Sequence, residues 1–381
     1  MSSLVLKNAN VVLPDRVATD SDILIENEKI AGVGDNLKAD KEIDCRGLTV
    51  FPGFIDIHNH GAVGIDVNEA DIEGLYKISK FLASQGVTAW FPTVVPDQDE
   101  VYQRVITAVD ELMKFQESEP VAQVLGIHYE GIFANQQMCG ALRPEFFKTF
   151  VIGNELERLP RLKNGIHLMT LAPEVEGGIE LIKKLRQLGW ISLIGHTKAD
   201  SETLDKACEA GAKHLTHFFN AMTGLHHREL GVVGWGLTKD EVTFDIIADK
   251  VHVNPKVLHF ACRTKTPAKV LLISDSIAPT GLGDGVFQLW GGKISVKDKK
   301  TSNERGSIAG SVITMQDAFR NIISLGFSIV EASIMASLNP AKLLGLQDVR
   351  GSIKTGSRAD LIALDERGKH VLTIIGGKIR R

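Results

Sequence analysis

Short apolar runs and segments of helical periodicity alternate through the middle of this chain, and this alternation limits the possible folds more than any other feature. The runs are rich in Val, Ile and Leu, which is typical of parallel strands buried on both faces. Eight runs have strand length: residues 49–57, 87–95, 123–129, 167–171, 191–194, 212–215, 242–247 and 269–274. Helical patterns lie between or after most of them: 72–84, 100–115, 181–188, 200–210, 315–325 and 330–337. We therefore expect an α/β protein with a closed (β/α)8 barrel of the TIM type.

The two ends of the chain have a different character. Residues 1–50 and 346–381 consist of short β-rich runs separated by polar turns, and neither end shows a helical period. A barrel occupies about 250 residues, so a chain of 381 residues has room for a second module. We expect one small β-sandwich built from both ends, with the barrel over residues 51–345.

Composition excludes several classes of protein. A formal net charge of −4 gives no electrostatic reason to expect nucleic acid or an anionic membrane as a partner. Cys45, Cys139, Cys208 and Cys262 are far apart and form no C-x-x-C pair, so neither a disulfide framework nor a zinc knuckle is indicated. The start lacks the apolar core of a signal peptide, and no later run is long enough to span a bilayer. We expect a cytoplasmic protein.

Histidines follow three of the expected strands. His196 and His217 come just after the fifth and sixth apolar runs. His58 and His60, in FPGFIDIHNHG, are two residues apart, a spacing that puts both rings on one face of an extended chain. Active sites of barrels lie at the carboxyl ends of the strands, and neutral imidazole is a common ligand for zinc or iron. The alternative is that these residues are hydrogen-bonded core or loop histidines.

Two acidic residues belong to the same expected rim. Glu130, in HYEG, ends the third strand, and its carboxylate could bind one metal ion or bridge two. Asp275, in LLISDS, ends the eighth, where Asp can take a proton from an attacking water and pass it to a leaving group. Taken singly, Glu130 could be an exposed loop acid and Asp275 a cap or turn residue. Their convergence with the histidines favours a metal site.

An ordered set of motifs resembles one family over nearly the whole chain. FPGFIDIHNHG, HYEGIF, LAPE, GHT, THFFNAM, HHRE and AGS-x-x-TM, in this order, resemble the N-acetylglucosamine-6-phosphate deacetylases of the amidohydrolase superfamily. The resemblance implies a metal-dependent barrel with a β-sandwich that hydrolyses the acetamide of an amino-sugar 6-phosphate. It implies one or two divalent ions, zinc or iron, with Glu130, His196 and His217 as principal ligands. His58 and His60 resemble the ligands of a second metal position, and Asp275 the catalytic acid and base.

The resemblance also implies contacts to the sugar phosphate. The implied residues are Ala141, Leu142, Asn220, Ala221, His227, Arg228, His252 and the turn Ile308, Ala309 and Gly310. In relatives the loop that carries the arginine reaches into the site of a neighbouring subunit, so we expect a homodimer. Arg suits this role because its planar fork donates two hydrogen bonds to phosphate oxygens. The alternative is a solvated basic loop paired with Glu229.

Two positions depart from the family pattern and leave alternatives open. Ile132 stands where relatives commonly have Pro, and Leu142 where they commonly have His. If that His orients the acetyl carbonyl, this chain must use another donor, a second metal, or a different sugar such as N-acetylgalactosamine 6-phosphate. A cyclic-amide or dipeptide hydrolase is a further alternative, although many of those carry a modified Lys on the fourth strand and HLMTLAPE has none. A noncatalytic barrel would lack the ligands that this chain retains.

Overall fold

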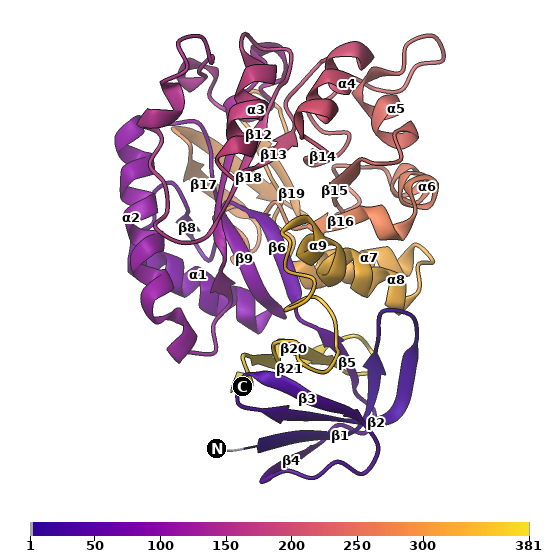
Figure 1. Cartoon of the computed structure of the whole chain (residues 1–381). Coiled ribbons are helices and arrows are strands. Elements are labelled where there is room, and N and C mark those ends of the chain that lie inside the picture. The colour runs from indigo at the N-terminus through magenta and orange to yellow at the C-terminus, as the bar shows by residue number, and fades with distance from the viewer. Residues whose placement is uncertain (1–2, 381) are drawn as a thin grey trace.

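Eight parallel strands form a barrel in the computed structural model, which describes residues 3–380 (Figure 1). In the barrel sheet β6 pairs with β9, and the sheet then continues in chain order through β11, β12, β13, β14, β15 and β16. The expected barrel fold is therefore confirmed. The barrel strands are β6 (Phe54–Asn59), β9 (Val87–Val94), β11 (Gly126–Phe133), β12 (Ile166–Leu171), β13 (Ile191–Ile194), β14 (His214–Leu215), β15 (Thr243–Ile247) and β16 (Val270–Ile273).

Side-chain hydrogen bonds to one buried carboxylate join the first barrel strand to the last. Asp56 of β6 is fully buried and accepts hydrogen bonds from the hydroxyl of Ser274 at 2.6 Å and from its backbone N–H at 3.2 Å. The side-chain amide of Asn59 donates to the same carboxylate at 3.1 Å. Because these bonds bring the carboxyl ends of β6 and β16 together, the residues that follow the two strands share one rim.

Helices cover the outside of the barrel. They begin where the sequence offers caps: Asp71 accepts from the N–H of Gly74 before α1, and Asp200 from that of Thr203 before α4. The helices are α1 (Ile72–Ser84), α2 (Asp99–Phe115), α3 (Gly178–Gln187), α4 (Ser201–Ala210), α5 (Gly231–Thr238), α6 (Pro255–Lys265), α7 (Met315–Ser324), α8 (Ile329–Ser333) and α9 (Asn339–Leu343), with a π-helical turn at Ile334–Leu338 between the last two. Short 3₁₀ turns lie at Gln116–Ser118, Gln136–Met138, Pro144–Phe146, Glu155–Arg158 and Pro267–Lys269.

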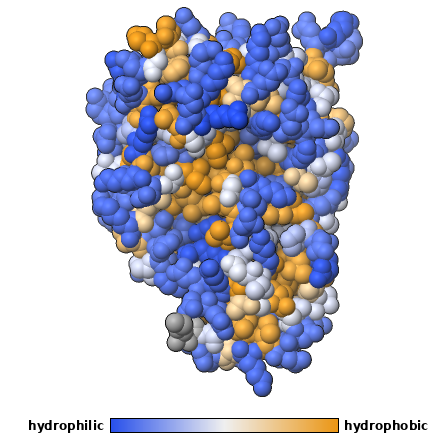
Figure 2. Space-filling model, in the orientation of Figure 1, coloured by the Kyte–Doolittle hydropathy of each residue, from blue (hydrophilic) through white to orange (hydrophobic). Residues whose placement is uncertain are grey.

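Three of these helices, α5, α6 and the five-residue α9, were not expected from the sequence. In α5 the residues from Val232 to Gly236 are all buried, so the segment is apolar on every side and shows no amphipathic period. Helix α6 begins at Pro255, which is well suited to a first helical position, but its apolar residues do not form one buried stripe, since Val257 and Phe260 are exposed. The space-filling view shows hydrophilic residues over most of one face, with hydrophobic residues gathered across its middle and in its lower part (Figure 2).

Both ends of the chain build a second sheet below the barrel (Figure 1). Its strand order is β22-β21-β20-β5-β1-β2-β3, and β4 pairs with β1. Leu6 and Ile25 from one part of this sheet share a core with Leu361 and Ile374 from the other, so the single sheet folds over its own core as a sandwich. The strands are β1 (Ser3–Val12), β2 (Val17–Glu26), β3 (Lys29–Gly34), β4 (Lys41–Asp44), β5 (Thr49–Pro52), β20 (Leu361–Leu364), β21 (His370–Ile375) and β22 (Lys378–Arg380).

The strand expected over residues 49–57 is two strands in the structure. Thr49–Pro52 pairs with β20 in the small sheet, whereas the barrel strand begins at Phe54. The chain turns at Gly53, where a Cβ atom would stand 2.2 Å from the methyl group of Thr88. One apolar run therefore serves two sheets, and we propose Gly53 as the place where the chain passes from the small domain to the barrel.

Other expected strands differ from the structure in extent. The run 123–129 is split into β10 (Gln123–Val124) and β11, and the run 212–215 forms a ladder only at its last two residues. A small antiparallel sheet between β16 and α7 was not expected: β17 (Gly285–Leu289), β18 (Gly292–Lys297) and β19 (Lys300–Asn303). A two-stranded ribbon, β7 (Gly61–Ala62) with β8 (Ile65–Asp66), follows β6. Among the described residues, no helix has the length and apolar character needed to cross a membrane.

Candidate active site

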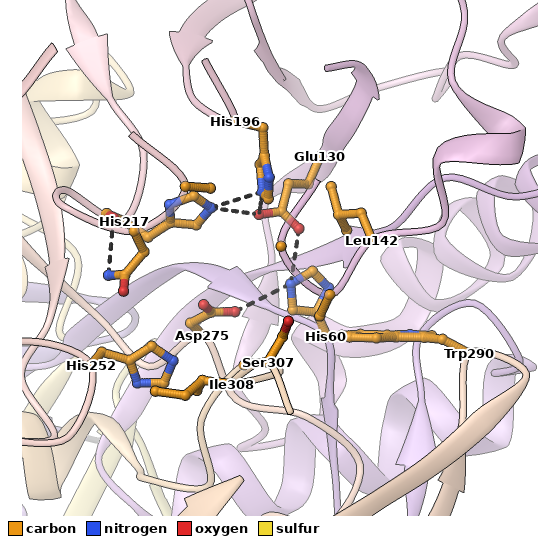
Figure 3. Close-up of a pocket in the computed structure, with 15 residues that line it drawn as sticks. His60, Glu130, Leu142, His196, His217, His252, Asp275, Trp290, Ser307 and Ile308 are labelled. Atoms are coloured by element: carbon orange, nitrogen blue, oxygen red, sulfur yellow. Dashed lines mark hydrogen bonds and ion pairs between the residues drawn. The ribbon is translucent and has the colours of Figure 1, made fainter. Parts of the chain in front are cut away.

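A cavity of about 280 Å³ opens at the carboxyl ends of the barrel strands (Figure 3). That volume suits one small ligand. Twelve of the residues expected from the sequence line it: His60, Glu130, Ala141, Leu142, His196, His217, Asn220, Ala221, His252, Asp275, Ile308 and Gly310. His58 lies beneath them with a fully buried ring, and Ala309 is buried behind the turn. The fold thus brings residues from nearly every barrel strand to one place.

Two groups of ligand-type side chains meet around Glu130. One carboxylate oxygen of Glu130 lies 3.3 Å from Nε2 of His196 and 3.0 Å from Nε2 of His217. Its other oxygen lies 3.2 Å from Nε2 of His60. His58, His60 and Asp275 form the second group, in which the two ring Nε2 atoms are 3.1 Å apart and Asp275 is 3.3 Å from that of His60. Glu130 therefore stands between two groups that could each hold a metal ion.

Hydrogen bonds on the far side of the rings determine what these histidines present to the cavity. Nδ1 of His60 donates to the carbonyl of Thr93 at 3.1 Å, and Nδ1 of His196 to that of Met138 at 2.8 Å. A neutral ring that donates from Nδ1 has only a lone pair at Nε2. In both residues that lone pair faces an oxygen of Glu130, so a proton or a metal ion must lie between them. The donor set therefore fits a divalent metal ion with nitrogen and oxygen ligands.

The charges in the site point in the same direction. Burial lowers the pKa of His60, but hydrogen bonds to Asp275 and Glu130 outweigh it and raise the pKa to about 10. Burial also lowers the pKa of His217, and its hydrogen bond to Glu130 outweighs that effect and raises the pKa to about 9. The pKa of Glu130 is held well below its usual range because the surrounding histidines outweigh its burial. The site is thus an anionic pocket that stabilises positive charge.

Three of these residues adopt left-handed backbone conformations that favour glycine. The φ angles are 48° at His196, 34° at His217 and 48° at Asp275. A left-handed conformation costs roughly 1 kcal/mol or more at a residue with a side chain. Each residue stands just after a barrel strand, and the backbone N–H of Asp275 donates to the carbonyl of His58 at 3.0 Å. Strained backbone conformations cluster at functional sites, and their repetition at the ends of three strands is typical of such a site.

A second layer of polar residues that the sequence did not reveal supports the histidines. Asp245 accepts a hydrogen bond from the backbone N–H of His217 and pairs with Nε2 of His214 at 3.0 Å. His128 lies under His58, with ring centroids 4.6 Å apart, and its ring bonds to Thr170 at 2.8 Å. All are buried inside barrel strands. The sequence feature that could have identified these second-layer residues is a polar residue within an otherwise apolar strand.

Loops outside the barrel strands supply other cavity residues. Trp290 and Ser307 come from the small antiparallel sheet and the segment after it, and Gly140 from the long loop after β11. The ring of Trp290 stands edge-on to that of His60, with centroids 5.4 Å apart. On the other side of the cavity, Nδ1 of His252 lies 2.6 Å from a carboxylate oxygen of Asp249. The sequence contained no pattern that placed Trp290 or Ser307 at the site.

Two expected residues lie outside the cavity of the single chain. His227 and Arg228 are exposed, and a guanidinium N–H of Arg228 donates to the ring of His227 at 2.5 Å. Neither residue belongs to the cavity lining. Within one chain, the structure therefore does not bring this loop to the site.

Comparisons with known proteins agree with this geometry. The amidohydrolase family model matches residues 49–380. The chain is 33% identical to N-acetylglucosamine-6-phosphate deacetylase of Bacillus subtilis, over 99% of this chain and 97% of that one. It is 36% identical to N-acetylgalactosamine-6-phosphate deacetylase of Escherichia coli O157:H7, over 85% of each chain.

Solved structures include a mutant N-acetyl-D-glucosamine-6-phosphate deacetylase from Mycobacterium smegmatis in complex with N-acetyl-D-glucosamine-6-phosphate. It superposes with a TM-score of 0.88 at 28% identity and covers 100% of this chain and 99% of its own. The family is metal-dependent, and the two groups around Glu130 could bind metal. The chain belongs to the amidohydrolase family and, within it, to the N-acetylglucosamine-6-phosphate deacetylases.

Proposed function

We propose that this protein hydrolyses the acetamide of N-acetylglucosamine 6-phosphate to acetate and glucosamine 6-phosphate. The observation that carries the proposal is the meeting of Glu130, His196 and His217 with Asp275 in one cavity of the barrel. An amide is a poor electrophile and its nitrogen a poor leaving group. A site for its hydrolysis must therefore activate the carbonyl, supply a nucleophile and protonate the amine.

Glu130, His196 and His217 would hold the principal metal ion, zinc or iron, and His58 and His60 would hold a second one. The fit rests on the ring nitrogens of His196 and His60, which face the Glu130 carboxylate in an arrangement that suits a divalent ion. When bound, the metal polarises the acyl carbonyl and makes a nearby water more acidic. Glu130 is the shared element, because its carboxylate contacts both groups: Oε1 lies near His217 and His58, and Oε2 near His60.

Asp275 is the proton carrier in this proposal. Burial raises the pKa of Asp275, but its interactions with His58 and His60 outweigh burial and lower the pKa, so the carboxylate is ionised at neutral pH. An ionised carboxylate can take a proton from the attacking water and deliver it to the amine nitrogen as the C–N bond breaks. Asp275 has a left-handed backbone, and its side chain lines the cavity.

The sugar phosphate would lie on the side of the cavity opposite Leu142 and Trp290. Figure 3 shows His252 and Ile308 near Asp275, on the side away from Leu142 and Trp290. Asn220, Ala221 and Gly310 also line the cavity. Asn220 and His252 offer polar side chains for hydroxyl and phosphate oxygens. This places the reacting amide between the sugar and the two metal groups.

His227 and Arg228 would serve the site of a second subunit. Both side chains are exposed, and Arg228 bonds to the ring of His227, which packs against the ring of His226. A phosphate dianion is a suitable partner for such a pair, since Arg can donate two hydrogen bonds to it. We infer a homodimer in which this loop completes the neighbouring cavity, and a cytoplasmic location, which the four unpaired cysteines support.

N-acetylgalactosamine 6-phosphate is the second candidate substrate, because the Escherichia coli relative named for that sugar is 36% identical to this chain. The test measures acetate release from the gluco and galacto phosphates and from unphosphorylated N-acetylglucosamine, with metal content determined on the same sample. We expect the phosphorylated gluco sugar to have the highest kcat/KM and each subunit to contain metal. Loss of activity on chelation and recovery with zinc or iron are also expected. A metal-loaded protein that releases no acetate from either phosphate would refute the proposal.

A further inference from the structure

One side of the cavity is apolar, and it is the side next to the metal groups. Leu142 and Trp290 stand beside Glu130 and His60 in Figure 3, whereas His252 lies across the cavity. Leu142 is only 4% exposed, and one of its methyl groups occupies the space beside Gly131, where a Cβ atom would be 2.3 Å away. Gly131 has a left-handed φ of 72° and directly follows Glu130. The leucine side chain is therefore fixed against the strand end that carries the central carboxylate.

Most polar groups of this wall are already bonded elsewhere. The guanidinium of Arg305 donates to the backbone carbonyls of Gly140, Ala141 and Leu142 at 3.3, 3.2 and 3.3 Å. The indole N–H of Trp290 donates to Asp66 at 3.1 Å. These carbonyls and the indole N–H are thus engaged outside the cavity. A ligand atom placed between the two side chains meets mainly carbon.

The position of the reacting amide decides what occupies this space. If the sugar lies beside Asn220 and His252, the carbonyl carbon lies near Asp275, and the rest of the acyl group extends the opposite way. That direction leads to Leu142 and Trp290. We propose that Leu142 and Trp290 form an acyl pocket that selects apolar N-acyl groups over polar ones, so Leu142 is a specificity-determining residue. This inference rests on the proposed function, because it takes its direction from the placement of the sugar.

Two substrates of equal size test the inference. N-propionyl- and N-glycolylglucosamine 6-phosphate have the same number of heavy atoms in the acyl group and differ in a terminal methyl against a hydroxyl. Comparing them removes the effect of length. A hydroxyl buried without a partner is disfavoured, and an apolar pocket rejects such an isostere by up to about 10². We expect kcat/KM for the propionyl substrate to exceed that for the glycolyl substrate by about tenfold or more.

Leu142→Asn changes the wall from apolar to polar at nearly constant volume. The ratio of the two kcat/KM values should fall by at least about fivefold in this variant. Both substrates are measured on the same enzyme sample, so partial misfolding does not change the ratio. The matched control is Leu282→Asn, a substitution at an exposed leucine that does not line the cavity, and the wild-type ratio should persist there.

The outcomes separate the inference from the proposed function. Absence of acetate release from N-acetylglucosamine 6-phosphate by metal-loaded protein would refute the function. Normal acetate release with equal rates on the two isosteres, or a ratio that Leu142→Asn leaves unchanged, would overturn the acyl pocket alone. Faster hydrolysis of the glycolyl substrate would also overturn it. In that case Ser307→Ala would test whether the Ser307 hydroxyl, which also lines the cavity, is the partner.

Discussion

Replacing Asp275 by Asn separates proton transfer from metal binding. The amide keeps the size of the carboxylate but cannot carry a proton between water and amine. The backbone should tolerate the change, because the left-handed φ of 48° at this position is one that Asn adopts readily. Two backbone hydrogen bonds also remain, from Asp275 to His58 at 3.0 Å and from Ser311 to Asp275 at 2.7 Å.

The expected loss follows from the contacts of the side chain. Asp275 lies 3.3 Å from His60 and 3.7 Å from His58, but Glu130, His196 and His217 form their group without it. The principal metal should therefore remain bound. General acid and base catalysis contributes about 10² to 10⁴ in rate, so kcat should fall by about 10² or more, equivalent to about 2.7 kcal/mol in the barrier.

The assay combines steady-state acetate release with metal content of the same preparation. Asp298→Asn is the matched control, because Asp298 is an exposed Asp with a left-handed φ of 51° that does not line the cavity. The control should keep wild-type activity. A kcat for Asp275→Asn within a few fold of wild type would refute the proton-carrier role. Loss of metal together with activity would show that Asp275 is mainly a ligand.

Three further predictions concern metal binding, phosphate recognition and stability. Glu130→Gln should lose both metal and activity, since an amide is a poorer ligand than a carboxylate; full metal content with near-normal turnover would exclude Glu130 as a ligand. Arg228→Ala should lower kcat/KM for the phosphorylated sugar, by a loss of roughly 1.5–3 kcal/mol in transition-state stabilisation, and leave kcat/KM for the unphosphorylated sugar unchanged. Equal effects on both sugars would exclude phosphate recognition. Mixing Arg228→Ala with Asp275→Asn protein should restore partial activity if the loop serves a second subunit. At Asp22, burial raises the pKa, but hydrogen bonds from Lys7 and from backbone N–H groups outweigh it and lower the pKa. The ionised Asp22 therefore stabilises the folded protein above the unfolded pKa of about 3.9, and this stabilisation is lost as pH falls through the lower folded pKa. Asp22→Asn should reduce this loss of Tm between neutral and acidic pH, and an unchanged Tm profile would contradict the assignment.

Local sequence pattern was sufficient for the barrel and for the position of the candidate ligands at its rim. Apolar runs that alternate with helical periods indicate parallel strands, and the carboxyl ends of such strands meet at one rim. A polar residue just after such a run is therefore placed by the fold itself. For this reason the sequence predicts that Glu130, His196, His217 and Asp275 lie close together, and all four line the same cavity in the structure.

Tertiary structure decided the features that depend on residues far apart in the chain. The run at Thr49–Pro52 reads like the start of a barrel strand, but its partner is β20, more than 300 residues away, and no local period records that pairing. Trp290 reaches the cavity from a small sheet whose alternating strands look like a surface hairpin. Asp245 lies within an apolar strand, and its role as the acceptor for the backbone N–H of His217 depends on a contact between β15 and the residues that follow β14.

The backbone conformations at the strand ends were also beyond the sequence. His196, His217 and Asp275 adopt left-handed φ angles, which any residue with a side chain adopts only occasionally, so local propensity does not predict them. Long-range hydrogen bonds, such as the one from Asp275 to His58, offset that local cost. The chain alone thus determined that Glu130, His196, His217 and Asp275 lie at the rim, because strand direction follows from local pattern. Their orientation toward a shared centre was decided by the closed barrel, because the contacts that hold it come from strands distant in sequence.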